Sequence, residues 1–178
     1  MRYKKDWEAT KQRFEDYWKG ENTGRPLMRV TGVKPGYYPF QIPEEIKSKS
    51  LEEKYMDPES VVRRYRYYCE THEFLGESFP NLNADFGPGS LAAYLGSEIE
   101  FQDRTVWFHP CVKEWEDYPE LKFDPENKWF KKHIWLFEEC KKLIGDDFPI
   151  AIPDLMENVD VLASLRGSMD LLYDMIEE

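Results

Sequence analysis

Three polar residues follow short apolar runs, and they are the first candidates for chemistry in this chain. Asn83 and Asp85 come after a strand-like segment, and Asp154 ends the run FPIAIPD. Parallel strands of α/β proteins present ligand-binding side chains at their carboxyl ends, so these three residues could bind a substrate. Asn and Asp also form helix caps and Asx turns, which is the structural alternative for each of them.

A glycine loop lies directly after the first pair. From Gly87 the chain reads GPGSLAAYLG, which lacks both the third glycine of a dinucleotide fingerprint and the Gly-Lys-Ser/Thr of a P-loop. Two interpretations remain. Gly87 and Gly89 could supply the backbone freedom of a strand-to-helix turn that Pro88 stiffens, or they could face a ligand.

The histidines and cysteines give weaker signals. His109 and Cys111 are two possible zinc ligands one residue apart, but a site needs three or four, and no further partners stand nearby. The sequence therefore predicts no metal site here. His72 has the ordinary pKa of a general base, about 6.5, but its position on an apolar stripe favours a core or boundary role.

Aromatic residues are abundant, at 16% of the chain. Trp107 is the candidate among them for contact with a flat substrate. The other members of a possible aromatic pocket are Phe108, Trp115, Trp129, Phe130 and Trp135. Large residues at helical spacing usually belong to a core, which is the alternative for this set.

Length and charge exclude several classes of protein. The 178 residues predict one domain, 1–178, and the net charge of -11 opposes binding to nucleic acid. No apolar run approaches the roughly 20 residues that span a bilayer, and the amphipathic start lacks the apolar centre of a signal peptide. We therefore expect a cytoplasmic protein. Cys69, Cys111 and Cys140 are odd in number and widely spaced, which predicts free thiols.

Apolar periodicity predicts two helices in the first half of the chain. The first carries an aromatic stripe and stops near Gly20, and the strand LMRVTGV follows Arg25-Pro26. A second helix should begin at Asp57-Pro58, because Asp accepts from free amides and Pro suits the first helical position. Its stripe predicts that it continues to Gly76. The stripes are Tyr3, Trp7, Thr10, Phe14 and Tyr17, and then Val61, Tyr65, Tyr68, His72 and Leu75.

The second half predicts a strand at 105–108, a helix from about Glu126 to Leu143, a buried strand in FPIAIPD and two short closing helices. Helices that alternate with short strands are typical of α/β proteins, in which helices join parallel strands. A closed eight-stranded barrel needs about 250 residues, so an open sheet or an incomplete barrel is expected.

Several segments together resemble the uroporphyrinogen decarboxylase-like superfamily, in its divergent bacterial branch. They are DWEATKQRFEDYWKGENTGRPLMRV, NADFGPGSLAAYLGSE, TVWFHPCVKEWEDYPELKFDPENKWF and FPIAIPDLMENVDVLASLRGSMDLLYDMIEE. The resemblance covers nearly the whole chain and implies the amino-terminal half of a (β/α)8 TIM barrel. It implies that Asn83, Asp85, Gly87 and Asp154 lie where the barrel binds its ligand, and that the glycine loop faces that ligand.

The superfamily includes tetrapyrrole decarboxylases and methyltransferases that use a corrinoid or a thiol. The decarboxylase motif M-R-Q-A-G-R is replaced by MRVTGVKPG, so the resemblance favours a corrinoid-linked methyltransferase component acting on a small methylated substrate. The methyltransferase branch carries its zinc ligands in the second half of the barrel. We therefore expect no cofactor in this chain alone, and zinc and a corrinoid only in a completed barrel.

Two other functions remain as alternatives. Half a barrel would expose sheet edges and apolar helix faces, which suits a non-catalytic binding or assembly module covered by a second copy or another protein. A corrinoid protein and a second copy of the chain are the partners expected from these hypotheses. The other alternative is a decarboxylase acting on a tetrapyrrole or a smaller acid. No catalytic residue is assigned from the sequence.

Overall fold

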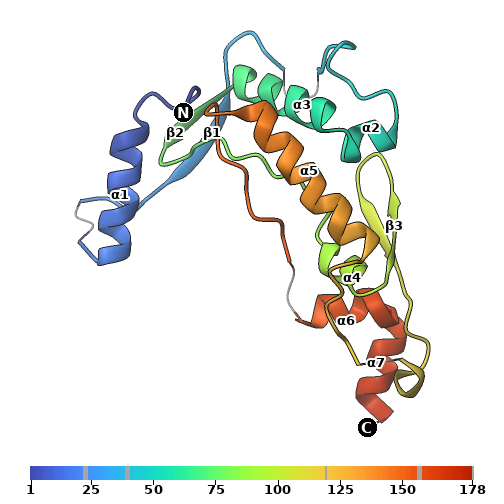
Figure 1. Ribbon diagram of the computed structural model, residues 1–178. Helices are drawn as coiled ribbons and strands as arrows, with labels where there is room; N and C mark the ends of the chain where they lie inside the picture. The colour runs from blue at the N-terminus through green and yellow to red at the C-terminus, as the bar shows by residue number, and fades with distance from the viewer. Residues whose placement is uncertain (22–23, 39–40, 119, 156–157, 178) are drawn as a thin grey trace.

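A computed structural model describes residues 1–21, 24–38, 41–118, 120–155 and 158–177 of the chain. Within these residues the protein is mixed α/β, with seven α-helices and two separate two-stranded antiparallel sheets (Figure 1). The molecule is elongated, with the amino terminus at one end and the last two helices at the other. None of the described helices is both long and apolar enough to cross a membrane.

The first helix, α1 (Trp7–Lys19), forms where the aromatic stripe predicts it. It ends because Gly20 takes the left-handed conformation, with φ of 74°, and its amide donates to the Asp16 and Tyr17 carbonyls. The predicted strand follows as β1 (Arg29–Val33). Both predictions are confirmed.

Two short-range caps start the next helices. Ser50 accepts from the Glu53 amide at the start of α2 (Leu51–Met56), and Asp57 accepts from the Ser60 amide at the start of α3 (Pro58–Thr71). The predicted start at Asp57-Pro58 is confirmed. The predicted end at Gly76 is wrong, because α3 stops at Thr71.

The residues after Thr71 form a strand instead of a further helical turn. Strand β2 (His72–Gly76) pairs antiparallel with β1, from Val33 opposite His72 to Arg29 opposite Gly76. His72 and Leu75 fit the apolar stripe of α3 by spacing, but pairing with a distant strand overrides that local pattern.

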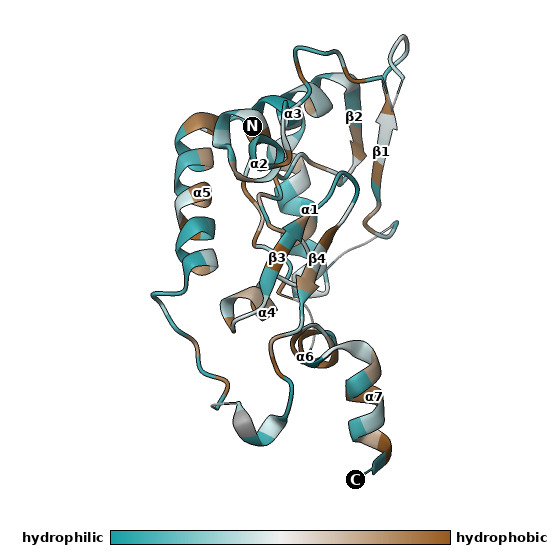
Figure 2. Ribbon diagram, turned by 90° about the vertical axis from the view of Figure 1, so that its right-hand side faces the viewer, coloured by the Kyte–Doolittle hydropathy of each residue, from teal (hydrophilic) through white to brown (hydrophobic). Residues whose placement is uncertain are grey.

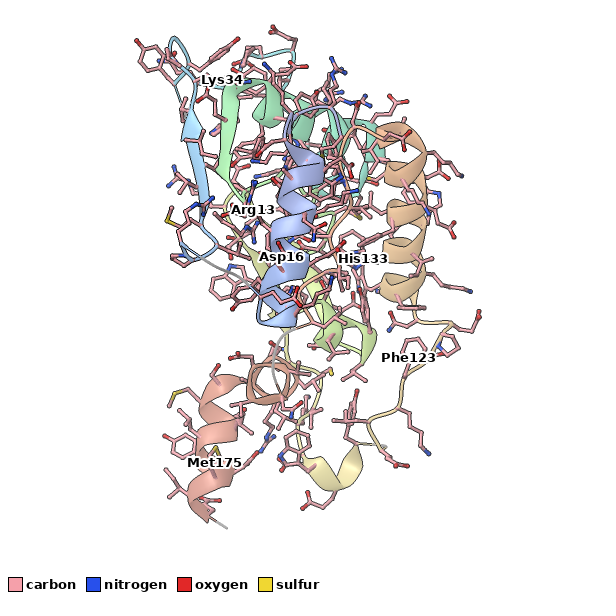
Figure 3. All side chains as sticks on the ribbon, turned by 90° about the vertical axis from the view of Figure 1, so that its left-hand side faces the viewer. Arg13, Asp16, Lys34, Phe123, His133 and Met175 are labelled. Atoms are coloured by element: carbon pink, nitrogen blue, oxygen red, sulfur yellow. The ribbon has the colours of Figure 1, made fainter. Side chains whose placement is uncertain are left out.

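A buried carboxylate ties α1 to this sheet. Glu77 is fully buried and accepts from Arg13 Nε at 2.6 Å, from Arg25 Nη2 at 2.6 Å and from the Met28 amide at 2.8 Å. Lys4, also buried, donates to the carbonyls of Phe74 and Gly76. Figure 3 shows Arg13 on α1, the helix that covers this region.

The glycine loop leads into α4 (Ser90–Tyr94), as expected, and then into a hairpin. Strand β3 (Glu98–Phe101) pairs antiparallel with β4 (Val106–His109). The predicted strand at 105–108 corresponds to β4, but its partner β3 was not anticipated. The charged residues of EIEF hide the alternation that the pairing reveals.

Helix α5 (Lys128–Ile144) lies against α3 and carries one side of the core. The Asn127 side chain caps it by accepting from the Trp129 and Phe130 amides. The predicted helix is confirmed within a residue or two at each end. The fully buried core around α3 and α5 contains Val62, Cys69, Leu82, Ala84, Phe86, Leu136, Cys140, Ile144 and Phe148.

The expected parallel strands are reduced to a single bridge. Leu82 and Ile150 lie side by side in parallel, with the Leu82 amide donating to the Pro149 carbonyl at 3.0 Å and the Ala151 amide donating to the Leu82 carbonyl at 2.7 Å. Both described sheets are antiparallel, so the prediction of parallel sheet strands is wrong for β1 to β4. β1 pairs with β2, and β3 pairs with β4, each in the opposite chain direction.

The run FPIAIPD is buried only at its start. Phe148 is 3% exposed, whereas Ile152 is 86% exposed. The prediction of a buried strand is therefore wrong beyond the bridge, because no described element packs against Ile152.

The last two helices form the lower end of the molecule in Figure 1. Helix α6 (Asn158–Arg166) packs against α4, and α7 (Ser168–Glu177) extends away from the rest. The two are joined by an ion pair from Arg166 to Asp174, at 2.8 Å, and Asp174 also accepts from Trp115 Nε1, in the short 3-10 helix η1 (Trp115–Asp117). The three cysteines are free thiols, and Cys69 and Cys140 are buried in the core.

Candidate functional site

The Asn83–Gly87 segment leaves the parallel bridge and turns sharply. Asp85 Oδ1 accepts from the Gly87 amide at 3.0 Å, and its other oxygen accepts from Asn83 Nδ2 at 2.5 Å. Ser90 Oγ donates to the Gly87 carbonyl at 2.6 Å. The Asx turn, which was the structural alternative for Asp85, is therefore formed, and Asn83 stays exposed beside it.

The two glycines of the loop allow it to pack closely on β4. A Cβ added at Gly89 would lie 2.4 Å from Phe108 Cδ2, and one added at Gly87 would lie 3.0 Å from Val106 Cβ. Gly87 also has a φ of 99°, which strains other residue types. These contacts explain both glycines by turn geometry and packing, without a ligand.

Trp107 lies on the other face of the same strand. Successive side chains of a strand point to opposite faces, so Trp107 points away from the face on which Val106 and Phe108 meet the loop. Its side chain is 57% exposed. The structure therefore does not bring Trp107 together with the glycine loop.

The other large aromatic residues do not share one pocket with it. Trp129 packs in the core, with its ring centroid 5.9 Å from that of Phe86, and Phe130 packs on Tyr94 at 5.5 Å. Trp115 hydrogen-bonds to α7, and Trp135 is 40% exposed on α5. These aromatic residues therefore lie in separate places in the structure and do not form one aromatic pocket.

Asp154 lies downstream of the other bridged residue. It follows Ile150 by four positions and is exposed, whereas Asn83 directly follows Leu82. Since the two bridged segments run parallel, both polar residues lie beyond their carboxyl ends. This is the arrangement on which the substrate-binding prediction for Asn83, Asp85 and Asp154 rests.

A cavity of about 350 Å³ opens beside Asn83. We call it the Arg64 pocket, because Arg64 is the charged side chain among the described residues that line it. Its lining comes from α3, from the bridged segment and from the loop before α2, and consists of Ile42, Val61, Arg64, Tyr65, Tyr68, Leu82 and Asn83. Only Asn83 among these was predicted as a site residue.

A smaller cavity of about 80 Å³ adjoins it through three shared residues, Ile42, Arg64 and Tyr68. The rest of its lining is mostly apolar and aromatic: Val33, Tyr38, Ile46, Tyr67, Thr71 and His72. Of the α3 residues that line these cavities, Val61, Tyr65 and Tyr68 were predicted as part of an apolar stripe. Arg64 was not part of that stripe. The consecutive arginines of VVRRYRYY were the available signal that charge lies beside it.

Burial sets the protonation states along this part of α3. It lowers the pKa of the Arg64 guanidinium, and it raises the pKa of the Tyr65 phenol well above its ordinary range. The Tyr65 hydroxyl oxygen accepts from the Asn81 amide, which fixes that ring against the bridged segment. Tyr65 therefore stays neutral at physiological pH, and Arg64 supplies the positive charge of the pocket.

His72 occupies a boundary position. Its Nδ1 lies 2.9 Å from the Tyr68 carbonyl oxygen and 3.0 Å from Thr71 Oγ1, and its ring stacks on that of Tyr68 with centroids 4.0 Å apart. These contacts hold the ring against the end of α3, which agrees with the boundary position expected from the sequence.

His109 and Cys111 have separate surroundings. His109 Nε2 lies 2.9 Å from Glu100 Oε2, whereas Cys111 Sγ lies 3.8 Å from the Tyr118 hydroxyl and 3.9 Å from Ser97 Oγ. Across the residues that the structure describes, no group of three or more His, Cys, Asp or Glu side chains is placed to hold a metal ion.

Comparison of the chain with protein-family models, with curated proteins and with solved structures finds no match in any of the three. The fold and the geometry of the pocket therefore stand on their own as the basis for a functional proposal.

Proposed function

We propose that this chain is the amino-terminal portion of a uroporphyrinogen decarboxylase-like barrel that serves corrinoid-linked methyl transfer. In this proposal the segments at Leu82 and Ile150 are two neighbouring barrel strands, and α5 is the crossover helix between them. Asn83 and Asp154 bind a small methylated substrate beyond the carboxyl ends of those strands, and Asp85 orients Asn83. Zinc and a corrinoid join only the completed barrel.

The parallel bridge between Leu82 and Ile150 is the observation that carries this proposal. Leu82 makes two backbone hydrogen bonds to the residues on either side of Ile150, Pro149 and Ala151. The long helix α5 lies between the two bridged segments in the sequence. A strand, a helix and a second parallel strand form the repeating unit of such barrels. The antiparallel pair β1·β2 then precedes that unit, and the β3·β4 hairpin is an insertion between Leu82 and α5.

The proposal assigns different tasks to the loop residues. Asn83 is exposed and can offer its amide to a ligand, while Asp85 and Gly87 hold the turn that orients it. Gly89 lets the loop approach β4. Trp107 would contact substrate only if a further element covered the exposed face of β4.

Corrinoid binding by the native gene product is the direct test. The protein is purified from its source, its mass is measured, and hydroxocobalamin is titrated while the corrinoid absorbance is recorded. We expect saturable binding, and about tenfold weaker substrate-dependent methyl transfer in the Asn83→Ala variant. The control is Gln12→Ala, on the exposed side of α1. A native product that binds no cobalamin and transfers no methyl group would contradict the proposal.

A second candidate is a non-catalytic assembly module, and the exposed apolar side chains of α7 favour it. No residue of α7 is buried, and its largely exposed members are Met169, Leu172, Tyr173, Met175 and Ile176. Figure 2 shows hydrophobic positions along this helix, which projects from the rest of the chain. Apolar surface of this kind usually marks an interaction site.

Sedimentation analysis distinguishes this candidate. Self-association that strengthens with concentration and disappears in Leu172→Glu would support it, with Glu177→Gln at the end of the same helix as the control. A chain that stays monomeric at all concentrations and binds cobalamin would favour the enzyme component instead.

A further inference from the structure

Helix α3 carries three arginines within four residues, and they differ in what balances their charge. Arg63 Nη2 pairs with Glu53 Oε1 at 3.0 Å, and Arg66 Nη2 pairs with Asp147 Oδ2 at 3.0 Å. Within the described ranges, no carboxylate lies within ion-pair distance of Arg64. Arg64 is thus the one of these three arginines without a directly paired carboxylate among the described residues, and Glu53 acts on it only as a weaker, unpaired charge.

The contacts of Arg64 satisfy only part of its guanidinium. Arg64 Nη2 donates to the Lys54 carbonyl in α2, the helix that lies next to α3 in Figure 1. Its Nε is buried and has no hydrogen-bond partner among the described residues. The Nε of Arg63 also lacks a partner, but the charge of Arg63 is balanced by Glu53.

A partly buried charge without a counter-ion is costly, so its position needs a reason. Arg64 lines both the larger and the smaller cavity. Its guanidinium is also partly removed from water, which lowers its pKa. A cation held at the meeting point of two cavities is placed to meet an anionic ligand, which would supply the missing counter-charge.

The residues around Arg64 indicate which chemical groups the ligand has besides its negative charge. Apolar and aromatic side chains dominate the lining, and Tyr65 and Tyr68 stack with centroids 5.7 Å apart at 24°. Asn83 adds one amide at the rim. A pocket that combines one cation, one amide and flat apolar walls suits an anion attached to an organic body better than a free inorganic ion.

We propose that the Arg64 pocket binds a small organic carboxylate. Arg64 pairs with the carboxylate, the ring of Tyr68 and the side chains of Ile42 and Val61 contact the apolar body, and Asn83 hydrogen-bonds to a polar group at its edge. The cavity volume of about 350 Å³ is within the range of small-molecule sites. This assignment shares Asn83 with the barrel proposal but does not depend on it, because it uses no corrinoid, metal or methyl donor.

Nuclear magnetic resonance of the arginine Nε–H groups tests the assignment in the full chain. Benzoate serves as the probe, with benzamide as its neutral counterpart and inorganic phosphate as a carbon-free anion. We expect benzoate to shift the Arg64 Nε–H resonance saturably, with a Kd on the order of 1 mM for so small a ligand. Benzamide and phosphate should bind at least tenfold more weakly, and the Arg63 and Arg66 resonances should stay in place.

The test variant and its control replace neighbouring arginines of the same helix, α3. Arg64→Gln should weaken benzoate binding at least tenfold, whereas Arg63→Gln should leave it within about twofold, since Arg63 lines neither cavity. If Arg64→Gln fails to fold, Asn83→Ala replaces it, with an expected loss of two- to fivefold. The proposal is overturned if benzamide or phosphate binds as tightly as benzoate, or if benzoate causes no saturable shift. It is also overturned if Arg64→Gln loses stability but keeps its affinity for benzoate.

Discussion

Glu77 joins three parts of the amino-terminal region through one carboxylate. Its carboxylate is fully buried and receives Arg13, Arg25 and the Met28 amide. The Arg25 hydrogen bond is the main cause that lowers the pKa of Glu77 to about 2, with the Met28 amide and Arg13 acting in the same direction against desolvation. The carboxylate is therefore charged at neutral pH and well below it.

Replacing Glu77 by Gln should destabilise the protein by about 3 kcal/mol at pH 7, because it leaves two arginines and an amide without their buried anion. A carboxyl whose folded pKa is lowered stabilises the protein above its ordinary pKa of 4.5. That contribution is lost as pH falls from 4.5 toward about 2. The difference in free energy of unfolding between wild type and Glu77→Gln should therefore shrink as pH falls through this window.

Urea unfolding across the same pH range measures this gap. Glu8→Gln is the control, because the Glu8 side chain is 84% exposed and its ion-pair partner in the described part of the chain is the exposed Lys11. It should change stability by less than about 0.5 kcal/mol. A Glu77→Gln deficit that is constant from pH 7 to pH 3 would show that the carboxylate charge is not what stabilises the region.

His133 is buried in the core with both ring nitrogens engaged. Its Nε2 lies 2.7 Å from the Ala84 carbonyl oxygen, so this nitrogen must carry the hydrogen and donate it. Its Nδ1 then accepts from the Tyr94 hydroxyl. The ring thus joins α5 to α4 and to the segment that follows Leu82, and Figure 3 marks its place in the molecule.

Burial lowers the pKa of His133, so this residue should stay neutral below pH 6.5, the ordinary value for histidine. Because the folded pKa is lowered, the stabilising contribution is complete above 6.5 and declines as pH falls from there toward the folded value. Imidazole resonances should report the Nε2–H tautomer and a midpoint below 6.5. A midpoint at or above 6.5 would contradict the burial of this ring.

Among the elements, the glycine loop and the β3–β4 hairpin must be considered together. The loop reaches β4 only because Gly89 has no side chain where the Phe108 ring lies. The backbone of Gly89, with φ of -84°, is one that any residue can adopt. Close packing is therefore the reason for a glycine at this position.

Gly89→Ala should destabilise the chain by about 1–3 kcal/mol, the usual cost of inserting a methyl group into a packed contact. The added Cβ would lie 2.4 Å from Phe108 Cδ2, so the ring or the loop must move. Gly32→Ala, in β1, is the matched control because nothing lies within 4 Å of its added Cβ. Thermal unfolding compares the two, and equal melting temperatures would contradict the packing argument.

The molecule as a whole has a well-packed part and a weakly packed part. The core around α3 and α5 contains the bridged residue Leu82, whereas α7 buries no side chain. Local stability follows such differences, because an element with few buried contacts opens at little cost. The lower end of the molecule in Figure 1 should therefore be the first to open.

Hydrogen exchange should reveal this difference. The amides of Leu82 and Ala151 donate across the parallel bridge beside the core, so they should exchange at least a hundredfold more slowly than amides in the middle of α7. Exchange followed by two-dimensional spectra at neutral pH measures both sets. Fast exchange at Leu82 and Ala151 would remove the main support for a strand–helix–strand unit.

Much of the helical structure could be predicted because its signals are local. The α1 stripe with Gly20, the Asp57-Pro58 start of α3 and the apolar face of α5 are patterns over a few residues, and hydrogen bonds within one segment satisfy them. The mixed α/β class followed from the same patterns. The Asx turn at Asp85 was among the predicted alternatives for the same reason.

Long-range pairing could not be read from the chain. Whether His72–Gly76 extends α3 or forms β2 depends on β1, and the partners of Glu77 lie 64 and 52 residues away in the sequence. Arg64 differs from Arg63 and Arg66 only in what the folded chain brings near it. A local pattern specifies which residues share one side of a helix or strand. The packing of distant elements decides which of the α3 arginines is paired with a carboxylate and which one lines a cavity.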